Sequence, residues 1–449
     1  MTATADRPAP SLEELVDAGD LPALDAWLGE RSPVEVAEEL ARLDRSQRAI
    51  PFRLLGKDRA LEAFELLDPA LQQELLEGLR DASVVQIFEA LDPDDRARLT
   101  EDLPAKVAKR LLAGLSPHER RLTATLLGYP EDSAGRIMSP EVVNLRASMT
   151  AAEAIERLRR IGRTAETIYA LPVTDDQRLL VGALGLRDLV LAAPDALVGD
   201  LMDTDVYSVP ASVDQEEAAR LIREADLLAL PVVDAENRLI GVVTVDDAME
   251  ILEEEDTEDV ARAGGSEPLG RPYLTVSVLA IARSRVVWLF ALIVAASLTV
   301  NVLSIFEATL DRVVQLALFI PLVIGTGGNT GSQAATTVTR AIAVGEVRLS
   351  DLGRVILREV RVGALLGSVL GVLALVPVWF LFGPDIALVV SLTMVSICTL
   401  ATLVGSMLPL LAMRVGADPA VMSAPFITTL VDASGLVLYF LIARVVLGI

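Results

Sequence analysis

Carboxylates are the residues best suited to chemistry in this chain, because it holds a single cysteine and a single histidine. One thiol and one imidazole cannot build the clusters that bind zinc or iron and sulfur, so any metal site must use oxygen ligands. Oxygen ligands favour hard cations such as Mg²⁺ and Ca²⁺. No nucleophile and no paired acid and base stand out in the first 270 residues, so we do not expect an enzyme.

One carboxylate, Asp432, lies well inside an apolar segment, "PFITTLVDASGLVLYF". An ionised carboxylate inside a bilayer costs on the order of 2.5 to 3.5 kcal/mol, so it marks a functional site by default. Thr428, Thr429 and Gly435 fall one turn on either side of Asp432, and we expect this small, polar stripe to face water and cations. Asp418, followed by Pro419, has the pattern of the cap of this helix.

A second polar stretch, "GTGGNTGSQ" at residues 325–333, interrupts another apolar segment. Backbone and amide groups in a bilayer are tolerated where helices pack very closely or where polar groups face a water-filled path. The stretch lacks the lysine of a phosphate-binding loop. We therefore interpret it as a packing seam, a pore lining, or both.

Acids also crowd the sequence "DDAMEILEEEDTEDVARAGG", which has no base between Asp246 and Arg262. Such a run is commonly only a solvated helix face. Like charges three or four residues apart nevertheless repel by a few tenths of a kcal/mol per pair, so a cation would stabilise the helix. Hydrated Mg²⁺ can bridge carboxylates without a complete protein cage, which makes it the expected ligand.

These residues belong to two different kinds of sequence. The 449-residue chain has a net charge of −24, yet from residue 271 onward it carries 11 arginines, no lysine and 8 carboxylates. The acidity of the first 270 residues excludes nucleic acid as a partner. Five apolar spans, roughly 286–306, 313–339, 362–382, 386–413 and 420–447, are each long enough to cross a bilayer. The distribution of arginines between them predicts a cytoplasmic amino terminus and an outside carboxyl terminus.

Two repeats organise the acidic part. Leu-Asp or Leu-Ser recurs every 24 residues from Leu43 to Leu115, in three cases before proline, and each copy starts a new helix with a polar cap. A longer repeat of strand, helix, strand, turn, strand and helix follows. That repeat resembles a pair of CBS domains, in which a Gly-x-x-Thr-x-x-Asp run holds the ribose and phosphate of adenine nucleotides.

Gly241, Thr244 and Asp247 match this run, whereas Gly185 replaces the threonine in the first copy before Asp188. The resemblance makes Asp188, Thr244 and Asp247 candidate contacts for ATP or another adenine nucleotide. A purely structural CBS pair is the alternative.

"YPEDSAGRIM" at 129–138, the CBS pair, the acidic run and the two membrane motifs resemble the MgtE family of magnesium channels across essentially the whole chain. The resemblance implies a homodimer whose second and fifth spans line one pore, with Asp432 recognising largely hydrated Mg²⁺. It implies the following pore-lining residues: Gly325, Gly327, Gly328, Asn329 and Thr428. It also implies that cytosolic Mg²⁺ bridges acidic groups and holds a plug helix against the pore. The sensing residues implied by position are Asp95, Asp214, Glu216, Asp226, Asp247, Glu250, Glu255, Glu258 and Asp259.

The sequence thus predicts a multidomain protein of the cytoplasmic membrane, in contact with lipid. Its expected parts are an α-solenoid N domain (1–128), α+β tandem CBS domains (129–200 and 201–249), an acidic connecting plug helix (250–284) and an all-α five-helix transmembrane domain (285–449). The expected function is a Mg²⁺-selective channel that cytosolic Mg²⁺ closes. A nucleotide-regulated secondary transporter of Mn²⁺ or Co²⁺ and a membrane-tethered enzyme are the competing hypotheses.

Overall fold

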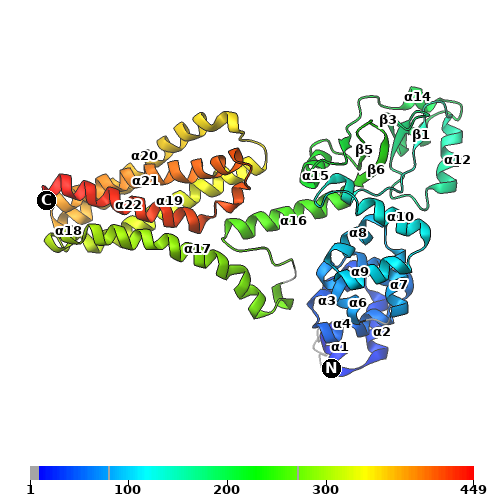
Figure 1. Cartoon of the computed structure of the whole chain (residues 1–449), viewed down its shortest axis with the longest axis horizontal. Coiled ribbons are helices and arrows are strands. Elements are labelled where there is room, and N and C mark those ends of the chain that lie inside the picture. The colour runs from blue at the N-terminus through cyan, green and yellow to red at the C-terminus, as the bar shows by residue number, and fades with distance from the viewer. Residues whose placement is uncertain (1–9, 79–80, 271–272) are drawn as a thin grey trace, which may run out of the picture. The chain divides into compact units, whose positions relative to one another are not determined.

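The computed structural model describes residues 10–78, 81–270 and 273–449. The chain divides into two compact units (Figure 1). The first comprises Met1–Glu255 with Gly270–Val276, and the second comprises Asp256–Leu269 with Ser277–Ile449. Each unit is described by itself below.

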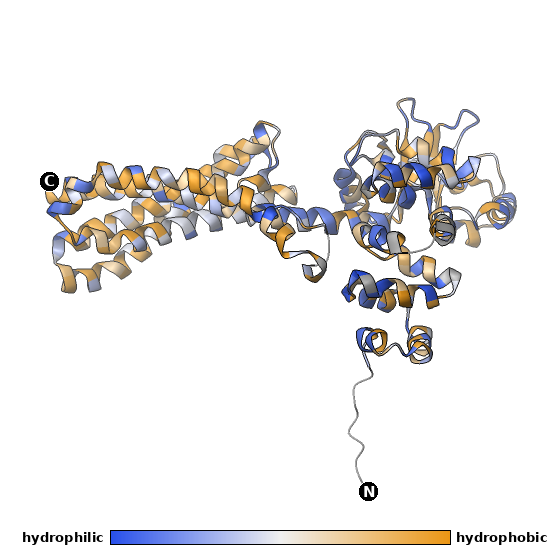
Figure 2. Ribbon diagram, turned by 60° about the horizontal axis from the view of Figure 1, so that its bottom comes forward, coloured by the Kyte–Doolittle hydropathy of each residue, from blue (hydrophilic) through white to orange (hydrophobic). Residues whose placement is uncertain are grey.

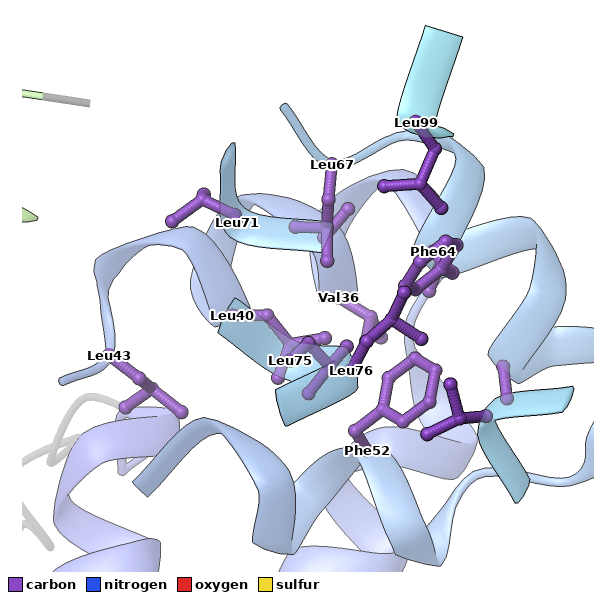
Figure 3. Packing of buried hydrophobic residues seen from close by; sticks show 14 of the residues in the cluster. Val36, Leu40, Leu43, Phe52, Phe64, Leu67, Leu71, Leu75, Leu76 and Leu99 are labelled. Carbon is purple, nitrogen blue, oxygen red and sulfur yellow. The ribbon is translucent and has the colours of Figure 1, made fainter. Parts of the chain in front are cut away.

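The first unit begins with short helices that pack in succession. They are α1 (Leu12–Ala18), α2 (Leu21–Glu30), α3 (Pro33–Arg42), α4 (Arg45–Leu54), α5 (Lys57–Glu65), α6 (Pro69–Gly78), α7 (Asp81–Ala90), α8 (Pro93–Asp102), α9 (Ala105–Gly114) and α10 (Pro117–Leu126). Helices α4, α6, α8 and α10 start 24 residues apart, which confirms the predicted helical repeat. Buried apolar residues of α1 to α9 share one core, in which the rings of Phe52 and Phe64 meet edge to face with centroids 6.2 Å apart (Figure 3).

The predicted helix caps are only partly correct. Ser116 accepts a hydrogen bond from the Glu119 amide at 3.3 Å, whereas Asp44 and Asp92 cap nothing with their side chains. In the first turn of α4, the long side chain of Arg48 instead joins the start of this helix to the end of the one before it. Arg48 donates to the Leu40 and Leu43 carbonyls at 2.9 and 2.8 Å.

Two further donors occupy the same place in their repeats. Gln72 donates to the Phe64 carbonyl at 2.9 Å, and Arg120 donates to the Leu112 carbonyl at 2.9 Å. These donors add a hydrogen bond to carbonyls near the end of a preceding helix, of which Leu40 and Phe64 also accept a backbone amide. Arg96, the equivalent residue of the third repeat, pairs with Glu119 instead.

Two matching α+β modules follow the helices. The first contains α11 (Ala134–Ile137), β1 (Leu145–Arg146), α12 (Ala151–Ile161), β2 (Ala170–Thr174), β3 (Leu180–Gly185) and α13 (Leu186–Leu191). The second contains α14 (Val198–Leu201), β4 (Val209–Pro210), α15 (Gln215–Glu224), β5 (Ala229–Val233), β6 (Leu239–Thr244) and α16 (Val245–Ala263). Each sheet pairs its first two strands in parallel and its last two antiparallel, so the predicted element order is confirmed in both copies.

Equivalent glycines hold the two modules together in the same way. A Cβ added at Gly182 would fall 2.6 Å from the Met202 sulfur, and one at Gly241 would fall 2.6 Å from the Met138 sulfur. Both distances are shorter than carbon and sulfur allow. Glycine at these two positions therefore lets a neighbouring segment cross close to the third strand of each sheet.

The second unit is a bundle of long helices that run side by side (Figure 1). They are α17 (Val278–Ile305), α19 (Leu316–Ala343), α20 (Leu352–Phe382), α21 (Pro384–Arg414) and α22 (Ala424–Leu447), with the short α18 (Glu307–Arg312) and η3 (Pro419–Val421) between them. Figure 2 shows apolar residues along their length. Gly363 and Gly367 bring α20 against the backbone of α21, since an added Cβ would lie 2.6 Å from the Cys398 oxygen or 2.5 Å from the Val395 Cα.

Four of the five predicted spans are long and apolar enough to cross a membrane, within the described residues. They are Val278–Ile305, Leu349–Phe382, Pro384–Arg414 and Ala424–Leu447. The remaining one, the second predicted span at 313–339, corresponds to α19, which is 28 residues long but is less apolar because it contains the glycine- and amide-rich stretch. That stretch is helical throughout.

The predicted connecting helix is wrong in extent. Helix α16 begins at Val245 and ends at Ala263, while Val278 already starts α17. Two glycines follow the end of α16, and Gly265 adopts the left-handed backbone that is common at helix ends, with φ of 71°. The acidic helix therefore stops about twenty residues before the predicted boundary at 284.

Candidate cation sites

The polar stretch of α19 forms a packing seam on one side. A Cβ added at Gly327 would lie 2.6 Å from Ile397 Cδ1 on α21 and 3.0 Å from Val431 Cγ1 on α22. One added at Gly328 would lie 2.6 Å from Thr428 Cγ2. The absence of side chains at these glycines is thus what lets α19 approach its neighbours, as expected for a seam.

The opposite side of the same stretch is uncovered within the single chain. Gly325 and Asn329 are exposed, and so is Gln333 one turn further along. A Cβ at Gly325 would meet nothing within 4 Å. The predicted lining residues therefore divide between two faces of α19, and an amide-bearing row lies on the open face.

The predicted stripe around Asp432 is wrong in part. Thr428 faces α19, where its hydroxyl lies 3.0 Å from the Ser332 hydroxyl, and it also donates to the Ala424 carbonyl at 2.9 Å. Gly435 packs against Ile397 of α21 and is buried. These two positions are used for helix packing, because small residues let α22 approach its neighbouring helices closely.

Asp432 itself is half-buried, and its Oδ1 has no hydrogen-bond partner among the described residues. A buried carboxylate oxygen without a partner is unfavourable, so the site calls for a cation or a water molecule. Asp418 does not cap α22 as predicted. Its side chain instead accepts from the Ala420 amide at 2.8 Å and caps η3, and α22 begins after Ser423.

The first unit contains a second candidate site, a cavity of about 120 Å³ that we call the acidic cavity. Asp94, Asp95 and Arg98 reach it from α8, and Asp247 and Glu254 reach it from α16. Its remaining lining residues are Glu101, Asp132, Arg136, Ile137, Gln215 and Ile251. The cavity thus joins the helical repeat to the second α+β module through carboxylates.

Two arginines neutralise part of this charge. Arg98 pairs with Glu250 at 2.9 Å and also with Glu254. Arg136 pairs with Glu101 at 2.7 Å. Asp94 is only 8% exposed, and its Oδ1 is buried without a hydrogen-bond partner among the described residues. The cavity thus has more carboxylates than arginines, and one carboxylate oxygen has no hydrogen-bond partner among the described residues. Such a site suits a hard divalent cation.

Burial raises the pKa of several of these acids, and repulsion between them adds to the effect. The pKa of Asp95 rises to about 8 and that of Asp247 to about 6, in each case mainly through burial. The pKa of Glu65 rises to about 7 through burial and the nearby Asp92. Carboxylate oxygens of Glu65, Asp92 and Asp95 lie within 4.8 Å of one another. These groups resist ionising together unless a cation joins them.

The other predicted sensing residues lie elsewhere in the first unit. Asp214 caps α15 by accepting from the Glu216 amide at 2.9 Å, and Glu216 pairs with Arg220. Asp226 adopts a left-handed backbone, with φ of 53°, in the turn after α15. Glu255 accepts from the Gln215 side chain at 3.2 Å.

Two predicted sensing residues belong to the second unit. Glu258 pairs with Arg262, and Asp259 lines a separate cavity there. Of the predicted sensing residues, therefore, only Asp95 and Asp247 line the acidic cavity, and Glu250 pairs with Arg98, which also lines it.

Several cavity residues were missed by the sequence reasoning. Asp94 stands beside Asp95 in "LDPDDRAR", where both follow the proline that starts a helix, and this signal was available. Glu254 lies in the acidic run, although the resemblance did not assign it a role, whereas Arg98 carries no such signal because only the packing of distant helices brings it to the cavity.

The candidate nucleotide contacts form a pair in one module only. The Thr244 hydroxyl donates to Asp247 Oδ2 at 2.5 Å at the start of α16. In the first module Gly185 takes the place of that threonine, and a Cβ there would lie 3.2 Å from Asp188 Oδ2. The hydroxyl and carboxylate arrangement is therefore present at Thr244 and Asp247 alone.

Comparisons with known proteins assign each part of the chain. Residues 31–132 match the MgtE intracellular N domain, residues 134–195 and 198–254 match CBS domains, and residues 320–442 match the MgtE divalent cation transporter domain. The magnesium transporter MgtE of Thermus thermophilus is 40% identical over 456 residues, which cover 98% of both chains. The magnesium transporter MgtE of Enterococcus faecalis is 37% identical over 320 residues, covering 71% of this chain and 70% of that one.

A solved structure, the cytosolic domain of the Mg²⁺ channel MgtE in complex with ATP, is similar with a TM-score of 0.51 and 38% identity. It covers 54% of this chain and 98% of that chain. A helical repeat, a CBS pair and a bundle of apolar helices with a half-buried carboxylate define a multidomain membrane transport protein. The chain belongs to the MgtE family of divalent cation transporters.

Proposed function

We propose that this protein is a Mg²⁺-selective channel that imports Mg²⁺ across the cytoplasmic membrane and closes when cytosolic Mg²⁺ binds its acidic residues. The observation that carries the proposal is the unpartnered oxygen of Asp432 within a bundle of apolar helices. A carboxylate is a ligand that Mg²⁺ prefers, and Mg²⁺ usually keeps several of its waters. The names of the related magnesium transporters support Mg²⁺ as the cargo.

A homodimer would complete the path. The open face of α19 places Gly325 and Asn329 outside the single-chain bundle, and lipid cannot satisfy a row of amides and exposed backbone. A second copy that faces this row would enclose a polar, water-filled path next to Asp432. Helix α17 has no buried residue within the chain and so leaves further apolar surface for a partner or lipid.

The acidic cavity is the proposed sensor for cytosolic Mg²⁺. Asp94, Asp95 and Asp247 would hold the ion there, since the buried Asp94 oxygen lacks a partner and burial raises the pKa of all three acids. An ion that bridges α8 and α16 would draw the helical repeat and the second CBS module together. It can shift the protein only by binding that drawn-together state more tightly than the loosened one.

An adenine nucleotide is the proposed second regulator. The solved relative is a complex with ATP, and Thr244 and Asp247 supply a hydroxyl and a carboxylate in the CBS pattern. Asp247 also lines the acidic cavity, so nucleotide and Mg²⁺ would share one carboxylate.

Mg²⁺ flux into liposomes that contain the purified protein tests the channel proposal. Asp432→Asn should remove most of the flux, while Asp385→Asn at the start of α21 serves as the matched control and should not. The protein should also carry Mg²⁺ down its gradient alone. Wild-type flux in a well-folded Asp432→Asn dimer would refute the pore assignment, and a strict need for a proton or sodium gradient would favour a secondary transporter instead.

The distribution of arginines predicts that the amino terminus is cytoplasmic and the carboxyl terminus outside. We propose the same orientation for the described helices. Cysteine labelling from each side of sealed vesicles, with single cysteines at either end of the chain, tests it.

A further inference from the structure

Arg262 lies near the end of α16 and holds two carboxylates from different elements of the second unit. Its Nη1 donates to Asp418 Oδ2 at 2.6 Å, and its Nη2 pairs with Glu258 one turn earlier on α16. About a third of each of the three side chains is exposed: 33% for Arg262, 32% for Glu258 and 31% for Asp418. The guanidinium therefore bridges α16 to the loop before η3.

That contact lies directly before the helix that carries Asp432. The second oxygen of Asp418 accepts from the Ala420 amide at 2.8 Å, so the carboxylate is fixed at the start of η3. Beyond Arg262 the chain turns at Gly265, where an added Cβ would lie 3.3 Å from Pro425 Cγ and 3.7 Å from Ser423 Oγ. The end of α16 is thus seated on the junction between η3 and α22.

Ser423 shows how tightly this junction is covered. Its side chain is 0% exposed, and its hydroxyl has no hydrogen-bond partner among the described residues. Release of the α16 end would uncover it, because Gly265 is one of its neighbours.

We propose that Arg262 is a tethered cation that fills the Glu258 and Asp418 carboxylate pair and so holds the end of α16 on the start of α22 without a divalent ion. Two carboxylates on separate elements form a place that a divalent cation could bridge. The guanidinium occupies it with directed, charge-assisted hydrogen bonds and is always charged. Glu258, for which the family resemblance implies Mg²⁺ sensing, then binds arginine instead.

The consequence for gating rests on the proposed function. If the α16 end regulates the pore, part of the closing contact persists at low cytosolic Mg²⁺, and ion binding in the acidic cavity adds to it. Removing Arg262 should then raise the Mg²⁺ concentration needed for closure.

The chain offers a matched control. Arg340 of α19 pairs with Asp256 of α16 at 3.0 Å, but these side chains are 61% and 63% exposed. Exposed pairs contribute little because water and salt screen them. Removing Arg340 takes away a positive charge that also pairs with α16 but leaves the less exposed Arg262 bridge in place.

Maleimide labelling of a Ser423→Cys reporter tests the proposal in the full-length protein, with Cys398→Ser in the background. Labelling is measured in EDTA and again in millimolar Mg²⁺. The reporter should react slowly in both. Arg262→Gln should speed the reaction in EDTA by about tenfold, the effect expected for losing a charge-assisted hydrogen bond. Arg340→Gln should leave the rate unchanged, and Arg262→Lys should restore part of the protection.

Slow labelling of Arg262→Gln in EDTA would overturn the proposal. Fast labelling of the unsubstituted reporter in EDTA with protection by Mg²⁺ would also overturn it, and would return the carboxylate pair to the divalent sensor. Because the readout is labelling, a failure of the channel proposal would show in flux and leave this result unaffected.

Discussion

Gly327 and Gly325 lie two residues apart on α19, about 200° around the helix, and should respond to alanine in opposite ways. At Gly327 the new Cβ would fall 2.6 and 2.9 Å from Ile397 and 3.0 Å from Val431, so side chains of two neighbouring helices must move. Overpacking of this kind costs typically about 1 to 3 kcal/mol. At Gly325 nothing lies within 4 Å, and alanine in a helix gains up to about 1 kcal/mol over glycine.

The assay is thermal or denaturant unfolding of the purified full-length protein in detergent, with oligomeric state followed by size-exclusion chromatography. Gly327→Ala should lower the midpoint of unfolding and weaken Mg²⁺ flux, because α19 is pushed away from α21 and α22. Gly325→Ala should keep or raise the midpoint. If both variants unfold like the unsubstituted protein, the seam does not depend on close approach at Gly327 and the packing argument is refuted.

Three further predictions concern the first unit. Without divalent ions, the free energy of unfolding should fall as the pH rises from about 4 to about 8. The pKa values of Asp95 (about 8), Glu65 (about 7) and Glu166 (about 7) are raised, so the folded state holds protons that the unfolded state has lost. Unfolding midpoints of the full-length protein across this pH range measure the slope, and Asp95→Asn should make the slope shallower. Millimolar Mg²⁺ should raise the midpoint of unfolding at pH 8, since an ion that binds only the folded protein stabilises it. Substitution of both Asp95 and Asp247 by asparagine should remove most of that rise. An unchanged rise in the double variant would place the sensor elsewhere. Thr244→Val keeps the side-chain shape but removes the hydroxyl beside Asp247, so ATP affinity measured by equilibrium binding should fall, whereas equal affinity would separate Thr244 from the nucleotide.

The sequence predicts the periodic parts of the fold well. The 24-residue spacing of helix starts and the two copies of the α+β module are properties of neighbouring residues, so they are visible without tertiary contacts. Helix ends depend on local signals too: Gly264 and Gly265 follow Ala263 directly and end α16, although the resemblance implied a connecting helix that continues further.

The faces of the membrane helices are less predictable. The sequence identifies the polar stretch of α19, yet it cannot separate Gly327 from Gly325, because only the neighbours Ile397 and Val431 decide which glycine is enclosed. The same limit explains Gly435, whose small size serves contact with α21 rather than a stripe around Asp432.

The acidic residues are the part of the site where the prediction from the sequence differs most from the structure. Charge counting identified α16 as a cation-binding helix, but Glu250 and Glu254 pair with Arg98, and Glu258 pairs with Arg262. Arg98 lies far from the acidic run in the sequence, so only the folded chain reveals its pairs, whereas Glu258 and Arg262 are four residues apart on one helix and could be paired from the sequence.

Single-channel recording of the reconstituted protein, with Mg²⁺ varied separately on each face, tests the central claim most directly. Mg²⁺ current should flow at low cytosolic Mg²⁺ and should shut off as cytosolic Mg²⁺ reaches the millimolar range, with no such closure when Mg²⁺ is raised on the other face alone. Currents that do not change with cytosolic Mg²⁺, or Mg²⁺ movement without any channel current, would contradict the proposal that the protein is a Mg²⁺ channel closed by cytosolic Mg²⁺.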